Sequence, residues 1–279
     1  MREINAAQIT ETVKKLCIES NCHLGQDIKS CISECYQKEP WEPAKEILGR
    51  IIENYEIADA KNQPVCQDTG VACVFLKIGQ DVHITGSITE SVNEGVRQGY
   101  AEGYLRKSVV ADPLNRVNTG DNTPAMIYTE LVEGDRIEIT VAPKGFGSEN
   151  MSRIAMLRPS DGIQGVKDFV LKAVEEAGPN PCPPIVVGVG IGGTFDKAAY
   201  LAKKALLRPV DERNETSFYA QLEQELLEKI NALGIGPQGF GGKTTALGVN
   251  IEWFPTHIAG LPVAVNINCH VTRHQTEVL

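Results

Sequence analysis

The apolar run at residues 71–78 constrains the fold most, because it directly follows a turn built of chemically reactive side chains. The turn at 64–70 places a thiol, an amide, a carboxylate and a hydroxyl in four consecutive residues between a proline and a glycine. The apolar run itself is typical of a buried strand. A reactive turn held by a core strand is a common scaffold for a site, although a surface turn with an incidental cysteine has the same pattern.

The first 60 residues are predicted to be mainly helical. Three apolar stripes recur with helical spacing between residues 6 and 60. The segment 23–25 breaks the first stripe, and the prolines at 40–43 separate the second from the third. We therefore expect a helical N-terminal segment at 1–60 within a single domain that spans 1–279.

The rest of the chain alternates predicted strands and helices. The strands are too irregularly separated for a regular doubly wound sheet, so we expect an α/β fold with mixed sheets and surrounding helices. A β-hairpin is predicted across 125–141, centred on Glu133-Gly134-Asp135. Strands are expected at 71–78, 81–84, 125–132, 136–141, 185–189, 245–253 and 261–267, and helices at 87–107, 163–176, 194–207 and 215–233.

Composition narrows the class of protein. Of 279 residues, 42% are apolar and 23% are charged, which is ordinary for a globular protein. The net charge of −9 argues against a nucleic-acid surface. No apolar run is long enough to span a bilayer, and the polar residues 1–10 lack the core of a signal peptide. We therefore expect a cytoplasmic protein, without nucleic-acid or membrane partners, whose cysteines are reduced thiols or metal ligands.

The eight cysteines fall into two groups. Cys66, Cys182 and Cys269 each lie in a turn beside a predicted strand, and three such thiolates can hold a soft metal centre. Three ligands on a four-iron cluster would leave one iron open to a substrate. Spacing alone leaves zinc, or three unconnected structural thiols, as alternatives. The remaining cysteines suit core packing: Cys17, Cys22, Cys31, Cys35 and Cys73.

Two glycine-rich segments raise the alternative of nucleotide binding. Residues 185–207 read as a strand, a glycine turn at 188–194 and a helix, the order of a dinucleotide-binding unit. The third glycine comes too early, and the acidic residue that would bind the ribose is missing. The segment 234–245 ends in Gly-Gly-Lys-Thr but lacks the frame of a phosphate-binding loop. A nucleotide-binding oxidoreductase therefore stays as the alternative from a different class.

Several longer motifs occur in a fixed order. They are Pro-Val-Cys-Gln-Asp-Thr-Gly, Arg-Lys-Ser, Asn-Thr-Gly-Asp-Asn-Thr-Pro, Lys-Gly-x-Gly-Ser-Glu-Asn, Cys-Pro-Pro with Gly-x-Gly-Ile-Gly-Gly-Thr, Leu-Gly-Ile-Gly-x-Gln-Gly-x-Gly-Gly-x-Thr-Thr, Pro-Thr-His and Asn-Cys-x-x-Thr-Arg-His. From 65 to 274, the chain resembles the alpha subunit of the class I, iron–sulfur fumarate hydratase and L(+)-tartrate dehydratase family. The resemblance implies a hydro-lyase with a 4Fe-4S cluster held by Cys66, Cys182 and Cys269.

The same resemblance implies how a small dicarboxylic hydroxy acid would bind. Gln67 and Asp68 would contact the substrate, with Asp68 near its hydroxyl and taking part in proton transfer. Arg106 would grip a carboxylate, the backbone at Gly147 would line the pocket, and His257 would hydrogen-bond the substrate. A guanidinium pairs bidentately with a carboxylate, which suits the role of Arg106. As the alternative, Arg106 and the next lysine would end the predicted helix 87–107 and suit its dipole.

The resemblance also implies a partner and leaves the substrate open. In the family the catalytic base comes from a second domain or a beta subunit, so we expect this chain to need a beta subunit for activity. Phe146 stands where the family usually has glycine, and His270-Val271 replaces two small residues, which puts substrate preference in doubt. Reversible dehydration of L-malate to fumarate, a step of the tricarboxylic acid cycle, is our first expectation. L(+)-tartrate dehydration is the nearest alternative, and a zinc-stabilised scaffold without activity is a third.

Overall fold

The computed structural model describes residues 2–279, which form two compact units. The first unit contains residues 2–24, 55–145 and 273–279, and the second contains 25–54 and 146–272. Each unit has its own sheet and its own apolar core, and each is described by itself below. Whether 1–279 acts as the single domain expected from the sequence stays a prediction.

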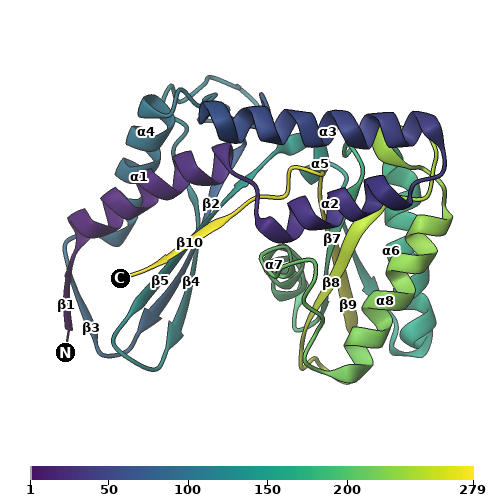
Figure 1. Cartoon of the computed structure of the whole chain (residues 1–279). Coiled ribbons are helices and arrows are strands. Elements are labelled where there is room, and N and C mark those ends of the chain that lie inside the picture. Colours follow the sequence, from purple (N-terminus) through teal and green to yellow (C-terminus); the bar gives the residue numbers. More distant parts are fainter. Residues whose placement is uncertain (1) are drawn as a thin grey trace. The chain divides into compact units, whose positions relative to one another are not determined.

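The first unit is built on a four-stranded mixed sheet, in the order β10 (Gln275–Val278), β5 (Ile137–Lys144), β2 (Val71–Gly79), β4 (Met126–Val132) (Figure 1). β2 pairs in parallel with β4 and antiparallel with β5. Its residues are nearly all buried, which suits a central strand covered on both faces.

Two helices of the first unit, α1 (Ala6–Cys22) and α4 (Ile88–Glu102), pack closely on one another and share a core with this sheet. Gly95 and Gly99 permit the contact, because a Cβ atom at either position would lie within 3 Å of α1. A short strand before α1, β1 (Arg2–Asn5), pairs in parallel with β3 (Val82–Thr85).

The second unit has another four-stranded mixed sheet, in the order β6 (Arg153–Leu157), β9 (Leu261–Asn268), β7 (Ile185–Gly192), β8 (Ala246–Phe254). The helices α6 (Gly162–Ala177) and α8 (Ser217–Ala232) cover one face with a large apolar core, and α7 (Phe195–Ala205) covers the other (Figure 1). The unit also includes α2 (Gln26–Lys38), the start of α3 (Glu42–Lys61), the short helix α5 (Phe146–Glu149), and the 3-10 turns η1 (Pro159–Asp161) and η2 (Pro237–Gly239).

The predicted α/β class, with mixed sheets and a helical N-terminal segment, is confirmed. The predicted hairpin at 125–141 is wrong, because β4 and β5 do not pair with one another and β2 lies between them. Alternation of apolar and polar residues identifies a half-buried strand but not its partner. The more apolar β2 takes the centre and separates the two.

The predicted glycine turn at 188–194 is also wrong over most of its length, because β7 continues to Gly192. A Cβ atom at Gly188 or Gly190 would lie 2.1 Å from a backbone oxygen of α7. These glycines therefore let α7 approach the sheet, and the turn is confined to Gly192 and Gly193, which have φ of +89° and +69°.

The helix predicted at 87–107 ends at Glu102, so Arg106 does not lie in its last turn. The interpretation of Arg106 as a cation that suits the helix dipole is therefore wrong. β1, β6, β10 and α5 were not predicted from the sequence. Within residues 2–279, no helix combines the length and apolar character needed to cross a bilayer.

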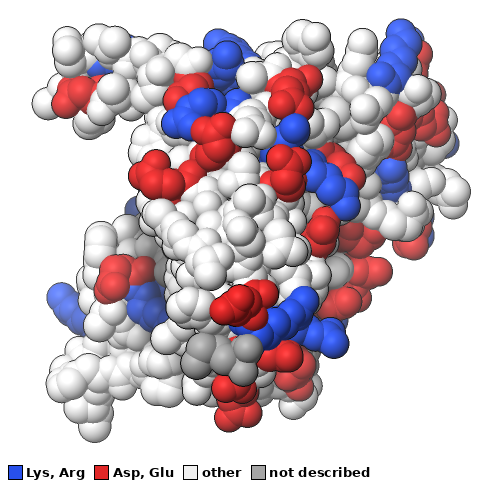
Figure 2. All heavy atoms as spheres, turned by 90° about the vertical axis from the view of Figure 1, so that its left-hand side faces the viewer, with Lys and Arg blue, Asp and Glu red and all other residues white. Residues whose placement is uncertain are grey.

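Charged side chains of both signs are interspersed on the face of the molecule shown in Figure 2. Ion pairs on the first unit include Lys77 with Glu138 at 2.8 Å and Arg97 with Asp121 at 3.0 Å. Exposed pairs of this kind contribute little to stability, so the apolar cores must supply most of it.

Candidate active site

The turn at 64–70 closes on itself through its polar groups. The amide of Asp68 donates to the sulfur of Cys66 at 3.4 Å, and the amide of Gly70 donates to Asp68 Oδ1 at 3.0 Å. Gly70 has φ of +70°, and a Cβ atom there would lie 2.6 Å from the backbone of Lys144. The glycine that ends the motif is therefore required by both conformation and space.

Buried side chains from distant segments hold this turn. The hydroxyl of Tyr100 lies 2.8 Å from the carbonyl oxygen of Thr69 and 3.0 Å from that of Gly70. Burial raises the pKa of Tyr100 well above its ordinary value, so its hydroxyl stays a donor. The side-chain amide of Asn122, which is fully buried, donates to the carbonyl of Gly70 at 3.1 Å. The dense polar turn at 118–124 thus serves to position the reactive turn.

Arg106 is linked to the same turn through its backbone. The hydroxyl of Thr69 donates to the carbonyl of Arg106 at 3.0 Å, and the amide of Ser108 donates to Asn122 at 2.6 Å. The side chain of Arg106 is exposed, and within residues 2–279 no acidic side chain pairs with it. The first unit therefore presents Cys66, Gln67, Asp68 and an unpaired guanidinium from one hydrogen-bonded set of loops.

The second unit presents Cys182 in a fixed loop. Cys182 is exposed and has φ of +54°, and its amide donates to the carbonyl of Pro179 at 3.1 Å. Its own carbonyl lies 3.0 Å from Nδ1 of His270. Gln238 donates to the next carbonyl, that of Pro183, from its side chain at 2.7 Å and from its backbone at 2.8 Å.

Cys269 follows β9 and immediately precedes His270, so the loops of Cys182 and Cys269 are neighbours within the second unit. Cys269 is half-buried, and its carbonyl accepts the hydroxyl of Thr272 at 2.9 Å. Sequence reasoning treated His270 only as a departure from the family pattern. The structure shows that it supports the Cys182 loop.

The other two candidate residues of the second unit are exposed. Gly147 lies in α5, which is anchored by Glu149: Lys203 and Asn266 each donate to that carboxylate at 2.7 Å. Nδ1 of His257 accepts the amide of Ala259 at 3.1 Å. A nitrogen that accepts carries no proton, so a neutral His257 ring bears its proton on Nε2, where it can donate to a ligand.

The remaining cysteines lie in different environments. Burial raises the pKa of Cys17 to about 12, as expected of a packing residue. On α2, a hydrogen bond from Cys31 lowers the pKa of Cys35 against the effect of burial, with help from Thr244 and Lys38. Within residues 2–279, no three His, Cys, Asp or Glu side chains are grouped to hold a metal ion, and this finding covers Cys66, Cys182 and Cys269 as well as these cysteines.

Comparison with known proteins agrees with the order of these motifs. The family model described as Fumarate hydratase (Fumerase) matches residues 10–278, nearly the whole chain. The chain belongs to this fumarate hydratase family.

A Methanocaldococcus jannaschii protein named provisionally as an L(+)-tartrate dehydratase subunit alpha is 50% identical over 274 residues, covering 95% of each chain. The L(+)-tartrate dehydratase subunit alpha of Escherichia coli strain K12 is 33% identical over 284 residues. That alignment covers 99% of this chain and 93% of the relative. The Shigella sonnei protein of the same name matches to the same extent.

Proposed function

We propose that this chain is the alpha subunit of a 4Fe-4S-dependent hydro-lyase that reversibly dehydrates L-malate to fumarate. Membership of the fumarate hydratase family carries the reaction class. The hydrogen bonds that hold the reactive turn at 64–70 in one conformation support the proposal. Two further thiols lie in neighbouring loops of the second unit.

The chemistry of the three proposed ligands, taken residue by residue, suits an iron–sulfur cluster. The proposed ligands Cys66, Cys182 and Cys269 are all at least partly exposed thiols, in contrast to the buried Cys17 and Cys73. The amide that donates to the sulfur of Cys66 suits a thiolate ligand, since hydrogen bonds to sulfur tune such clusters. When bound, a cluster with three protein ligands supplies a Lewis acid that makes a hydroxyl a better leaving group.

The protein residues would orient the substrate and move its proton. Arg106 would bind one carboxylate through its unpaired guanidinium, and Gln67 would donate to the substrate through its side-chain amide. Nε2 of His257 would donate a hydrogen bond, and the backbone at Gly147 would line the pocket. Asp68, two residues after the proposed ligand Cys66, would exchange a proton at the substrate hydroxyl.

A beta subunit would complete the active site and supply the catalytic base. The relatives are named as alpha subunits, which supports a second chain. We propose that residues 1–279 act as one cytoplasmic catalytic domain and are inactive without that partner. Malate–fumarate interconversion by the isolated chain at the rate of the complex would contradict this division of labour.

Metal analysis tests the cluster directly. We expect the full chain, prepared anaerobically, to contain iron and sulfide, and Cys182→Ser to lose both. Cys31→Ser is the matched control, because Cys31 is a half-buried thiol on α2 that has no proposed role in the cluster. Wild-type chain that binds zinc or nicotinamide and holds no iron would exclude the proposal in favour of its rivals.

L(+)-tartrate is the second candidate substrate, and the names of the relatives favour it. Tartrate differs from malate by one more hydroxyl, so discrimination must come from polar groups that face that carbon. Assays of the assembled enzyme with L-malate, fumarate and L(+)-tartrate will separate the two. A role in the tricarboxylic acid cycle follows only if malate and fumarate are the substrates turned over.

A further inference from the structure

Arg273 is a buried cation. Its side chain is in a residue only 5% exposed, and within residues 2–279 it makes no ion pair. Burial raises the pKa values of the Cys22 thiol and the Tyr100 phenol, and the charge of Arg273 acts to lower both. Neither is negatively charged near neutral pH. A buried guanidinium left without a counter-charge is costly, so a structure keeps one only where something offsets the cost.

The contact that Arg273 makes is with the reactive turn. Its Nη2 donates to the carbonyl oxygen of Asp68 at 2.6 Å, across 205 positions of sequence. Its Nε is buried and has no hydrogen-bond partner among residues 2–279. Arg273 therefore fixes the backbone between the proposed ligand Cys66 and Gly70. Its Nε–H group remains able to donate a further hydrogen bond.

Sequence position adds a second link. Arg273 follows Cys269 by four residues, and Asp68 follows Cys66 by two. The hydrogen bond between Arg273 and Asp68 lies within the first unit, two residues from the proposed ligand Cys66. Tyr100 and Asn122 hold the end of the turn at Thr69 and Gly70, the Val65 amide donates to the carbonyl of Asn21 at 3.0 Å before Cys66, and Arg273 holds Asp68 between them.

We infer that Arg273 is a positioning residue of the Cys66 turn, acting at Asp68, and supplies the positive charge that balances an anionic iron–sulfur centre bound there. This inference rests on the proposed function for the identity of that centre. Groups that fix the orientation of metal ligands without binding the metal themselves contribute strongly to metal affinity. Their loss weakens metal binding about 10–100-fold. The guanidinium suits the role because it is charged at any physiological pH.

Two measurements on Arg273→Met test the inference, with Arg136→Met as the matched control. Arg136 lies in the same unit but is exposed and makes no side-chain hydrogen bond or ion pair within residues 2–279. In the metal-free full chain, we expect the amides of residues 66–70 to exchange hydrogen about tenfold faster in Arg273→Met, since a charged hydrogen bond is lost. In the anaerobically loaded chain, we expect iron to pass to a chelator about 10–100-fold faster.

Arg273→Lys keeps the charge but loses the planar fork, so its amide exchange and its iron loss should both lie between those of the wild type and Arg273→Met. If Arg273→Met does not fold, Arg273→Lys carries the same two measurements. Unchanged exchange at 66–70, or unchanged iron loss, overturns the inference. A wild-type chain that binds no iron or sulfide overturns the proposed function and the charge-balancing role. The exchange comparison on metal-free chain still decides whether Arg273 holds the turn.

Discussion

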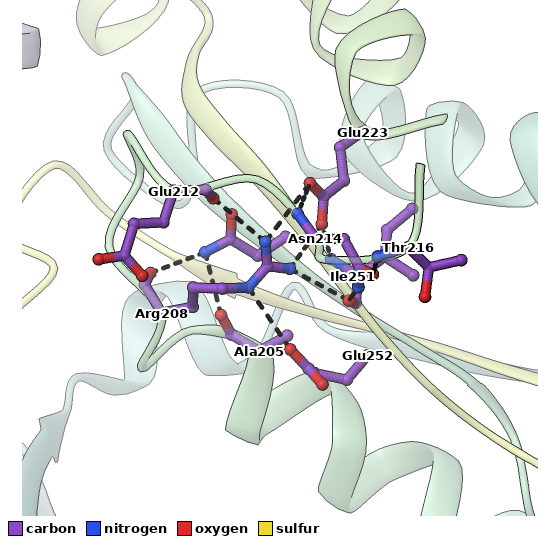
Figure 3. A network of polar contacts seen from close by, with 9 residues as sticks. Ala205, Arg208, Glu212, Asn214, Thr216, Glu223, Ile251 and Glu252 are labelled. Atoms are coloured by element: carbon purple, nitrogen blue, oxygen red, sulfur yellow. Dashed lines mark hydrogen bonds and ion pairs between the residues drawn. The ribbon is translucent and has the colours of Figure 1, made fainter. Parts of the chain in front are cut away.

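Nη2 of Arg208 lies 2.5 Å from Oε1 of Glu223, whose side chain is completely buried (Figure 3). Glu223 lies on α8, and Arg208 lies in the loop that follows α7. Both meet the backbone of Ile251 on β8: the Ile251 amide donates to Glu223 at 2.7 Å, and Arg208 donates to the Ile251 carbonyl at 3.1 Å. The pair therefore fastens α8 and the preceding loop to the central sheet of the second unit.

Glu223→Gln should destabilise the protein strongly, because it leaves the Arg208 guanidinium without its main counter-charge. Removing one member of a buried pair costs about 3–5 kcal/mol, and Glu252, whose carboxylate lies 3.5 Å from Arg208, should keep the loss near the lower end. Urea unfolding measures the change. Glu34→Gln, which breaks an exposed pair with Lys38, should cost about 1 kcal/mol or less. Equal losses in the two variants would show that the buried pair has no special role.

Asp121 should make stability depend on acidity. Burial acts to raise its pKa, but hydrogen bonds from Thr123 and Arg97 lower the pKa of Asp121 to about 2. A carboxyl whose folded pKa lies below its unfolded value of about 3.9 adds stability above that value, and this stability disappears as the pH falls toward the folded pKa.

The stability difference between wild type and Asp121→Asn should therefore be full at pH 6 and shrink between about pH 5 and 2. Unfolding midpoints measured across this range give the difference. Asp135→Asn, at an exposed position of the same unit, is the control for the loss of one surface carboxylate. A difference that stays constant down to pH 2 would mean that Asp121 gains nothing from its partners.

Arg106→Met should leave the fold intact and weaken turnover. The side chain is exposed and unpaired within residues 2–279, so its loss removes no structural contact. Loss of a charged hydrogen bond to a substrate carboxylate costs about 1.5–3 kcal/mol, which corresponds to roughly 10–100-fold in kcat/KM. Lys107→Met, the neighbouring exposed cation, should change kcat/KM far less. Steady-state kinetics of the assembled enzyme decide, and similar losses in both variants would indicate only a general effect of charge.

The sequence carried enough information to place most elements, because long apolar stripes and runs report burial directly. It did not carry strand partners: β4 and β5 look like a hairpin until β2 is inserted between them. The prediction of a turn at Gly188 and Gly190 was wrong, because the residue type alone does not distinguish a glycine needed for helix packing from a glycine needed for a turn.

For the candidate site, the sequence likewise identifies the proposed functional residues but not the contacts that hold them. Cys66, Gln67 and Asp68 are conspicuous because they lie together in one polar turn between a proline and a strand. The hydrogen bond that holds this turn could not be predicted from the sequence, because Arg273 and Asp68 are 205 positions apart. His270 similarly supports Cys182 from 88 positions away. Hydrogen bonds to a backbone carbonyl leave no trace in the composition near that carbonyl, so only the folded structure shows them.

Gly190→Ala should destabilise the second unit although it adds only one methyl group. The new Cβ atom would lie 2.1 Å from the carbonyl oxygen of Ala198 and 2.5 Å from the amide nitrogen of Ala202, so α7 would have to move off β7. Overpacking of this kind typically costs about 1–3 kcal/mol, and rigid backbone neighbours favour the upper end.

Gly260→Ala is the matched control, because its Cβ atom would come no closer than 3.9 Å to a neighbouring atom. Urea unfolding of both variants measures the costs. If Gly190→Ala proved as stable as Gly260→Ala, the glycines of β7 would need another explanation, and nucleotide binding by this segment would have to be reconsidered.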